Sequence, residues 1–207
     1  MDRDPHLHER NTMSTTTRAL SGFCLIMFAM ITPLCAQDAP VERSGFGLSL
    51  GLGPGSAGVT CEDCEDVFGD RVNGISGYLR IGAHVSNAVF VGVEGTGWLK
   101  NSEGFERRIA AVSLVVLTYP FSSSGLFLRG GFGGIRAVIE YDVVVVQGDG
   151  LTWQAGAGYD VGLGPVAITP YVTYLNSMEV AAHINGEAIG YNLNPNILQF
   201  GLAFTVR

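Results

Sequence analysis

The sequence predicts an all-β protein, an eight-stranded antiparallel up-and-down transmembrane β-barrel. Residues 198–206 alternate strictly, with large apolar residues at the even positions and Gln, Gly, Ala and Thr at the odd ones. Because successive side chains of a strand point to opposite faces, this stretch has one strongly apolar face and one small, uncharged face. Hydrophobic residues make up 47% of the 207-residue chain and charged residues only 15%. Even so, the chain after residue 36 contains no run of about 20 apolar residues, which a membrane-spanning helix would need.

The first 36 residues have the pattern of a secretory signal peptide that is removed from the mature chain. Arg18 precedes an apolar run at residues 23–31, and the small residue Ala36 stands at the expected cleavage site. A basic flank, an apolar core of about 7–15 residues and a small residue at the cut are typical of such peptides. Translation could start at Met1 or at Met13.

The mature chain is expected to be acidic and to form one domain. Residues 1–36 contain three basic and three acidic residues, so the net charge of −7 stays with the rest of the chain. An acidic chain without basic patches argues against nucleic acid as a partner. We expect residues 37–43 to form an N-terminal periplasmic segment and residues 44–207 to form the barrel.

Eight strand candidates follow from residue 44 onward. They lie at residues 45–53, 75–85, 89–99, 109–119, from 126 through 132, 153–161, 166–175 and 198–207. The stretch 109–119 is apolar on both faces, which leaves its orientation open, whereas the others place Gly, Ser, Thr and charged residues on one face. Most have the length of about 9–11 residues that a tilted bilayer crossing requires.

The connections between these strands alternate in length. Short turns are expected at residues 86–87, 121–124 and 162–165, and longer polar loops at residues 54–74, 100–107, 140–150 and 176–194. Membrane barrels have short periplasmic turns and longer external loops, and an even number of strands then leaves both termini in the periplasm.

Three local features add expectations about the strands. Pro170 cannot donate to a strand ladder, so we expect a β-bulge there. The run at residues 143–146 consists of four valines and does not alternate, which places it in a loop. Aromatic residues near the predicted strand ends are expected to form girdles at the membrane interfaces: Trp98, Tyr119, Phe121, Trp153 and Phe204.

With this strand pattern and this last strand, the chain resembles the small eight-stranded outer-membrane β-barrels of Gram-negative bacteria, the OmpA/OmpX-type transmembrane domain. In that family the last strand closes the barrel and ends in an aromatic residue that the assembly machinery reads. Here Val206 and Arg207 follow the last aromatic, Phe204. The resemblance implies location in the cell outer membrane, contact with outer-membrane lipid and lipopolysaccharide, and recognition of the C-terminal strand by the barrel-assembly machinery. We expect a monomer.

Four charged residues are predicted to form a cluster inside the barrel: Arg80, Glu94, Arg129 and Asp160. The tight turn at residues 86–88 constrains the register, and one of the two permitted registers puts Arg80 directly opposite Glu94. Eight strands enclose a space that side chains just fill, and charges buried there must pair. We interpret the cluster as a structural plug, with a gate or a proton-linked path as the alternative.

Cys61 and Cys64 stand in the first long loop and are predicted to form a small structural disulfide. In a cytosolic protein the same spacing would suggest a redox pair or half of a zinc site. An oxidising compartment favours the disulfide, and the acidic residues around the pair do not have calcium-loop spacing. We therefore expect no metal and no cofactor.

The function predicted from the sequence is a small outer-membrane barrel with a filled lumen that acts structurally or through its external loops. A narrow, OmpW-like channel for small solutes is the alternative. A soluble lipocalin-like binder would need large apolar residues inside. A lipid A-modifying barrel enzyme would need a catalytic pair, but His84 lies at one end of the lumen wall and His183 has no serine beside it. We expect no catalytic residue.

Overall fold

The computed structural model describes residues 43–61, 71–102, 105–141, 144–184 and 187–207. The chain divides into two compact units, Met1–Ala39 and Pro40–Arg207, and all described residues belong to the second. The predicted signal peptide and Cys64 lie outside the described residues, as does the side chain of Cys61, so the disulfide stays a prediction.

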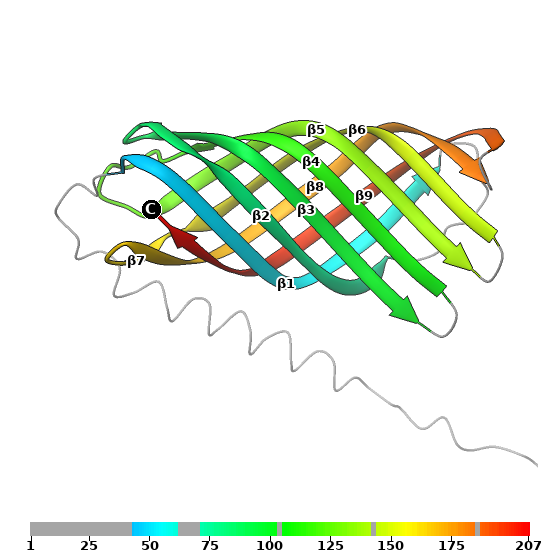
Figure 1. Ribbon diagram of the computed structural model, residues 1–207, viewed down its shortest axis with the longest axis horizontal. Coiled ribbons are helices and arrows are strands. Elements are labelled where there is room, and N and C mark those ends of the chain that lie inside the picture. The colour runs from blue at the N-terminus through cyan, green and yellow to red at the C-terminus, as the bar shows by residue number, and fades with distance from the viewer. Residues whose placement is uncertain (1–42, 62–70, 103–104, 142–143, 185–186) are drawn as a thin grey trace, which may run out of the picture. The chain divides into compact units, whose positions relative to one another are not determined.

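The described residues form nine antiparallel strands (Figure 1). They are β1 (Gly45–Cys61), β2 (Val72–Ser86), β3 (Val89–Ser102), β4 (Phe105–Thr118), β5 (Leu126–Tyr141), β6 (Val144–Tyr159), β7 (Val161–Leu163), β8 (Val166–Ile184) and β9 (Glu187–Val206). No helix in this part of the chain is long and apolar enough to cross a membrane.

Strand pairing closes the sheet into a barrel. Neighbours in sequence pair from β1 to β6, β9 pairs with β1 and β8, and β6 pairs with β8. The three-residue β7 continues β6 after Asp160, and both pair with β8. The nine strands therefore form an eight-stranded barrel. The prediction of a closed eight-stranded antiparallel barrel is confirmed.

The two ends of the barrel differ. We call the end that carries the connections at residues 87–88, 119–125 and 164–165 the turn end, and the opposite end, to which the hairpins β3–β4, β5–β6 and β8–β9 extend, the loop end. In Figure 1 the turn end lies on the left, where β7 and the C-terminus are labelled, and the long hairpins reach to the right.

The strands place large apolar side chains on the outer wall, while the inner wall carries the buried polar side chains together with buried apolar ones. On β9, Leu202 is 60% exposed while Gln199 is fully buried. β4, whose orientation the sequence left open, follows the same rule: Leu114 is exposed and Ser113 is buried. A soluble monomer rarely exposes an apolar patch of more than a few hundred Å². A wall of this kind around the whole barrel is the lipid-facing band of a membrane barrel.

Toward the loop end, exposed polar residues replace the apolar ones at the outward positions of five neighbouring strands. They are Asn73, Asn101, Arg108, Arg136 and Asp149. The strands do not stop there, since β5 runs on to Tyr141 and β6 begins at Val144. Most of the residues expected in the longer loops are therefore paired strand. Neighbouring backbones continue to satisfy each other's hydrogen bonds beyond the apolar band, so the ladder does not depend on lipid.

Two local expectations were wrong for the same reason. Residues 144–146 of the valine run lie in β6 and not in a loop, because Val146 pairs with both Ile139 and Ile184, and Val143 lies outside the described residues. Pro170 does not mark a bulge, because its pairing with Leu202 continues the β8–β9 register without a shift. On the other side of β8, the pairing is interrupted where β6 ends and β7 begins, next to Asp160.

The aromatic girdle is only partly as expected. Trp153 and Phe204 are exposed on the outer wall and Phe121 is exposed in the connection at residues 119–125, but Trp98 and Tyr119 are buried in the barrel. Trp98 donates its indole N–H to the carbonyl of Gly55 at 3.0 Å, which satisfies its polar group in the interior.

Candidate functional site

The interior of the barrel is the candidate site, and side chains fill it at three levels. The turn-end layer is an apolar cluster of Phe90, Val115, Leu117, Tyr119 and Phe127. The charge layer consists of Arg80, Glu94 and Arg129 with Tyr78 and Tyr171. The loop-end layer is a second apolar cluster of Ala57, Trp98, Ile109, Ala111, Ile135, Leu175, Val180 and Ile197.

In the charge layer, two guanidinium groups share one carboxylate. The register puts Arg80 of β2 directly opposite Glu94 of β3, and Arg80 Nη1 lies 3.6 Å from Glu94 Oε2. Arg129 reaches the same oxygen from β5 with a hydrogen bond of 2.8 Å. Thr96 donates to the other carboxylate oxygen at 3.2 Å. All three charged groups are buried, so each ion pair acts in a low-dielectric interior.

Aromatic rings pack against the two arginines. The guanidinium carbons of Arg129 and Arg80 lie 4.9 and 5.1 Å from the ring centre of Tyr78. Tyr171 meets Tyr78 edge to face, with ring centres 4.9 Å apart. Gly51 lies beneath both rings, and a Cβ at this position would come within 2.4 Å of Tyr78. The glycine on the inner wall makes room for the ring pair that packs against the charges.

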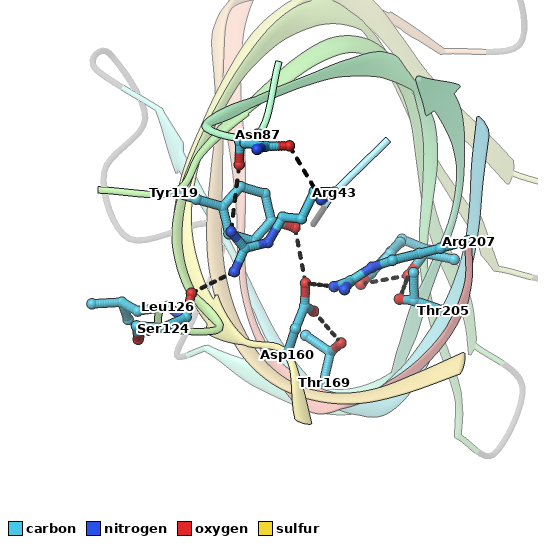
Figure 2. A network of polar contacts seen from close by, with 11 residues as sticks. Arg43, Asn87, Tyr119, Ser124, Leu126, Asp160, Thr169, Thr205 and Arg207 are labelled. Carbon is cyan, nitrogen blue, oxygen red and sulfur yellow. Dashed lines mark hydrogen bonds and ion pairs between the residues drawn. The ribbon is translucent and has the colours of Figure 1, made fainter. Parts of the chain in front are cut away.

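Asp160 does not join the charge layer. It lies at the turn end, in what we call the turn-end network, shown in Figure 2. It accepts hydrogen bonds from Tyr119 at 2.8 Å and from Thr169 at 2.6 Å, and it forms an ion pair with Arg207. The structure thus brings together three of the four residues predicted for the cluster and places the fourth in a separate network.

Arg43 belongs to the turn-end network and has no counterpart among the sequence predictions. It precedes β1, is only 1% exposed, and lies 4.1 Å from the ring centre of Tyr119 (Figure 2). Its guanidinium donates to the carbonyl oxygens of Ser124 at 2.5 Å and Asn87 at 3.4 Å, so it ties two short connections together. A single arginine before a strand gives no periodic signal from which this position could be inferred.

Burial shifts the pKa values of Arg43 and Tyr119 in the turn-end network. It lowers the pKa of Arg43, although the guanidinium remains charged at any physiological pH. Burial, with the negative charge of Asp160 as a second cause, raises the pKa of Tyr119 above its ordinary value. Tyr119 therefore stays a neutral hydrogen-bond donor to Asp160.

Several buried polar atoms of the inner wall have no hydrogen-bond partner among the described residues. They are Arg80 Nη1, Ser113 Oγ, both amide atoms of Gln154, Tyr171 Oη and Gln199 Oε1. Buried polar groups in proteins are usually satisfied by protein or by ordered water. Ordered water is therefore expected beside these atoms.

The histidines do not form a catalytic group with a serine in the described structure. The His84 ring lies against Phe90 at the turn end, with ring centres 5.1 Å apart, and His183 lies near the loop end of β8, opposite Gln147. Among the described residues, no three His, Cys, Asp or Glu side chains are grouped as metal ligands would be.

Comparison with known proteins places the fold. No protein-family model matches the chain, and no curated protein sequence matches it. Among solved structures, Neisserial surface protein A (NspA) is similar with a TM-score of 0.53 at 14% identity, over 80% of this chain and 99% of that one. Ail, the attachment invasion locus protein of Yersinia pestis, is similar with a TM-score of 0.51 at 12% identity, over 79% and 99%. The chain therefore has the fold of the small eight-stranded outer-membrane β-barrels.

Proposed function

We propose that this chain is a small outer-membrane β-barrel with a filled, non-conducting interior, which acts structurally or through surface contacts of its loop-end hairpins. The observation that carries the proposal is the filling of the interior at three levels. Two apolar clusters lie on either side of the buried charge layer, and Arg43 ties the short connections at the turn end. Eight strands enclose only enough space for such side chains.

In the proposed orientation the turn end faces the periplasm and the loop end faces outward. The apolar outer wall then contacts outer-membrane lipid, the polar outward residues lie at the level of the lipopolysaccharide headgroups, and β9 is the strand that the assembly machinery reads. The proposal treats the protein as a monomer and as a non-enzyme.

The described parts of the loop-end hairpins are paired strands. β5 and β6 remain paired from the apolar band to Tyr141 and Val144. Exposed ion pairs link neighbouring strands there, with Arg136 Nε 2.6 Å from Asp149 and Arg108 bound to Glu140. A solved structure of Ail is a complex with the heparin analogue sucrose octasulfate. That complex supports testing a sulfated glycan as a first surface ligand of the present chain.

Conductance of the refolded protein in planar bilayers tests the filled interior. We expect no defined current steps from the wild-type protein. The double variant Trp98→Ala with Arg43→Ala serves as the positive control. It empties part of the loop-end layer and releases the connections at the turn end, so it is expected to conduct, and its current steps show that inserted protein is detected. Reproducible current steps from the wild-type protein would contradict the proposal.

A narrow channel is the second candidate, and the unpartnered polar atoms of Ser113, Gln154 and Gln199 favour it. Water held by these groups would be the start of a hydrated path. Wild-type conductance that changes when Gln154 is replaced by Leu would support this candidate over the first.

Binding of intact cells that display the protein to immobilised heparin tests the surface role. We expect retention above that of cells lacking the protein, and a loss of retention when Arg108 and Arg136 are both replaced by Gln. Equal retention of all three cell types would exclude sulfated glycans as ligands.

A further inference from the structure

The interior carries more positive than negative charge. Three arginines are almost fully buried among the described residues, namely Arg43, Arg80 and Arg129, against two buried carboxylates, Glu94 and Asp160. Asp160 is already bound to a further arginine, Arg207, at the turn end. The charge layer is therefore left with two guanidinium groups and one carboxylate.

Arg129 makes the closer contacts to this carboxylate, which leaves Arg80 as the surplus cation. Arg129 donates to Glu94 at 2.8 Å and also binds Thr173. Arg80 Nη1 lies 3.6 Å from Glu94, beyond hydrogen-bond length, and it makes no hydrogen bond within the described part of the chain. The Arg80 side chain is nevertheless only 4% exposed.

The surroundings of Arg80 stabilise a cation without neutralising it. Its guanidinium carbon lies 5.1, 5.7 and 5.8 Å from the ring centres of Tyr78, Phe90 and Phe127. Ring faces attract a cation, but they supply no strong hydrogen-bond acceptor and no counter-charge. A water molecule could accept a hydrogen bond from Nη1, yet the surplus positive charge would remain in a medium where an uncompensated charge is costly.

We propose that Arg80 binds a small monovalent anion of the size of chloride or bromide inside the barrel, beside the Glu94–Arg129 pair. The anion supplies both the missing hydrogen-bond acceptor and the missing negative charge. Ser113, directly opposite Glu94 on the next strand, offers a buried hydroxyl without a partner on the same inner wall. We choose a monatomic anion because side chains leave little room within eight strands.

An anion that binds the folded state alone raises the folding equilibrium constant in proportion to its concentration above Kd. The test compares urea unfolding in detergent at constant ionic strength, with bromide replacing gluconate, which is too large to enter. The anion is present during refolding, because the layers on both sides close around the site. A tenfold rise in bromide is expected to raise the folding constant of the wild-type protein about tenfold.

Two variants assign this effect to the interior. Arg80→Met is expected to remove the bromide dependence, while Arg136→Met, which alters an exposed arginine in an ion pair at the loop end, is expected to keep it. Bromide dependence of equal size in wild type and Arg80→Met would overturn the proposal, as would its absence from the wild-type protein.

Anomalous scattering from crystals of the wild-type protein refolded in sodium bromide gives a direct answer even if Arg80→Met does not fold. A bromide peak is expected within about 3.5 Å of Arg80 Nη1. Density for water alone at that position, with no anomalous signal, would overturn the proposal.

Discussion

Removal of Glu94 is predicted to cost far more stability than removal of Arg80, although the two residues face each other. Glu94→Gln leaves two buried guanidinium groups without a counter-charge, and breaking a buried ion pair in this way costs about 3–5 kcal/mol. Arg80→Met leaves Glu94 with Arg129 at 2.8 Å and with the hydroxyl of Thr96. The charge layer is then neutral, and the free energy of unfolding should change by less than about 1 kcal/mol.

The measurement is urea unfolding of both single variants in detergent without halide, followed by tryptophan fluorescence. The protein has two tryptophans, and Trp98 lies inside the barrel next to the layer concerned. Gln is nearly the same size as Glu, so the Glu94→Gln loss reports charge rather than a cavity. The double variant Arg80→Met with Glu94→Gln should recover part of that loss, since one uncompensated guanidinium remains instead of two.

Equal losses for Arg80→Met and Glu94→Gln would refute the reasoning. They would mean that Arg80 contributes as much to the carboxylate as Arg129 does. Small losses for every variant would mean that water reaches the charges and screens them.

Three further predictions concern the packing and the location of the barrel. Gly51→Ala should cost about 1–3 kcal/mol in urea unfolding, because its Cβ would collide with the Tyr78 ring, whereas Gly95→Ala, with nothing within 4 Å, should cost little; equal effects would contradict the tight fit. Arg43→Ala should lower the free energy of unfolding by about 1–3 kcal/mol, because it removes the donor to the partly buried carbonyl groups of Asn87 and Ser124, and an unchanged unfolding midpoint would show that this end is already solvated. The protein should fractionate with the outer membrane and show heat-modifiable mobility on gels; recovery from the soluble periplasm without detergent would exclude the barrel in a membrane.

The alternation of side chains carried most of what the sequence could predict. It assigned the inner and outer faces of seven strands, and the tight turn at residues 86–88 limited the register to two possibilities, of which the structure has the one that puts Arg80 opposite Glu94. The inward position of Trp98 was also readable, because it shares parity with Glu94 and Thr96, but the general preference of tryptophan for interfaces suggested otherwise. Local periodicity was the better guide.

The alternation could not predict contacts across the barrel, nor how far the strands extend beyond the apolar band. Arg129 reaches Glu94 from β5, which is not a neighbour of β3, so the contact depends on how long side chains lean inside the lumen. The valines at 144–146 lie beyond the apolar band of the outer wall, where the outer face need not be apolar and the inner face need not be polar. Without that contrast the two-residue period vanishes, although the backbone pairing continues.

The turn-end network also has a consequence for the order of folding. Asp160 lies where β6 ends and β7 begins, and its ionic partner Arg207 follows β9, which pairs with the neighbouring strand β8. This ion pair therefore joins segments that are close in the sequence, and it can form before β9 pairs with β1 to close the barrel. Contacts that are already made in the transition state govern the rate of folding. Arg207→Met should accordingly slow refolding while changing the unfolding rate little, so that the network positions β9 for closure.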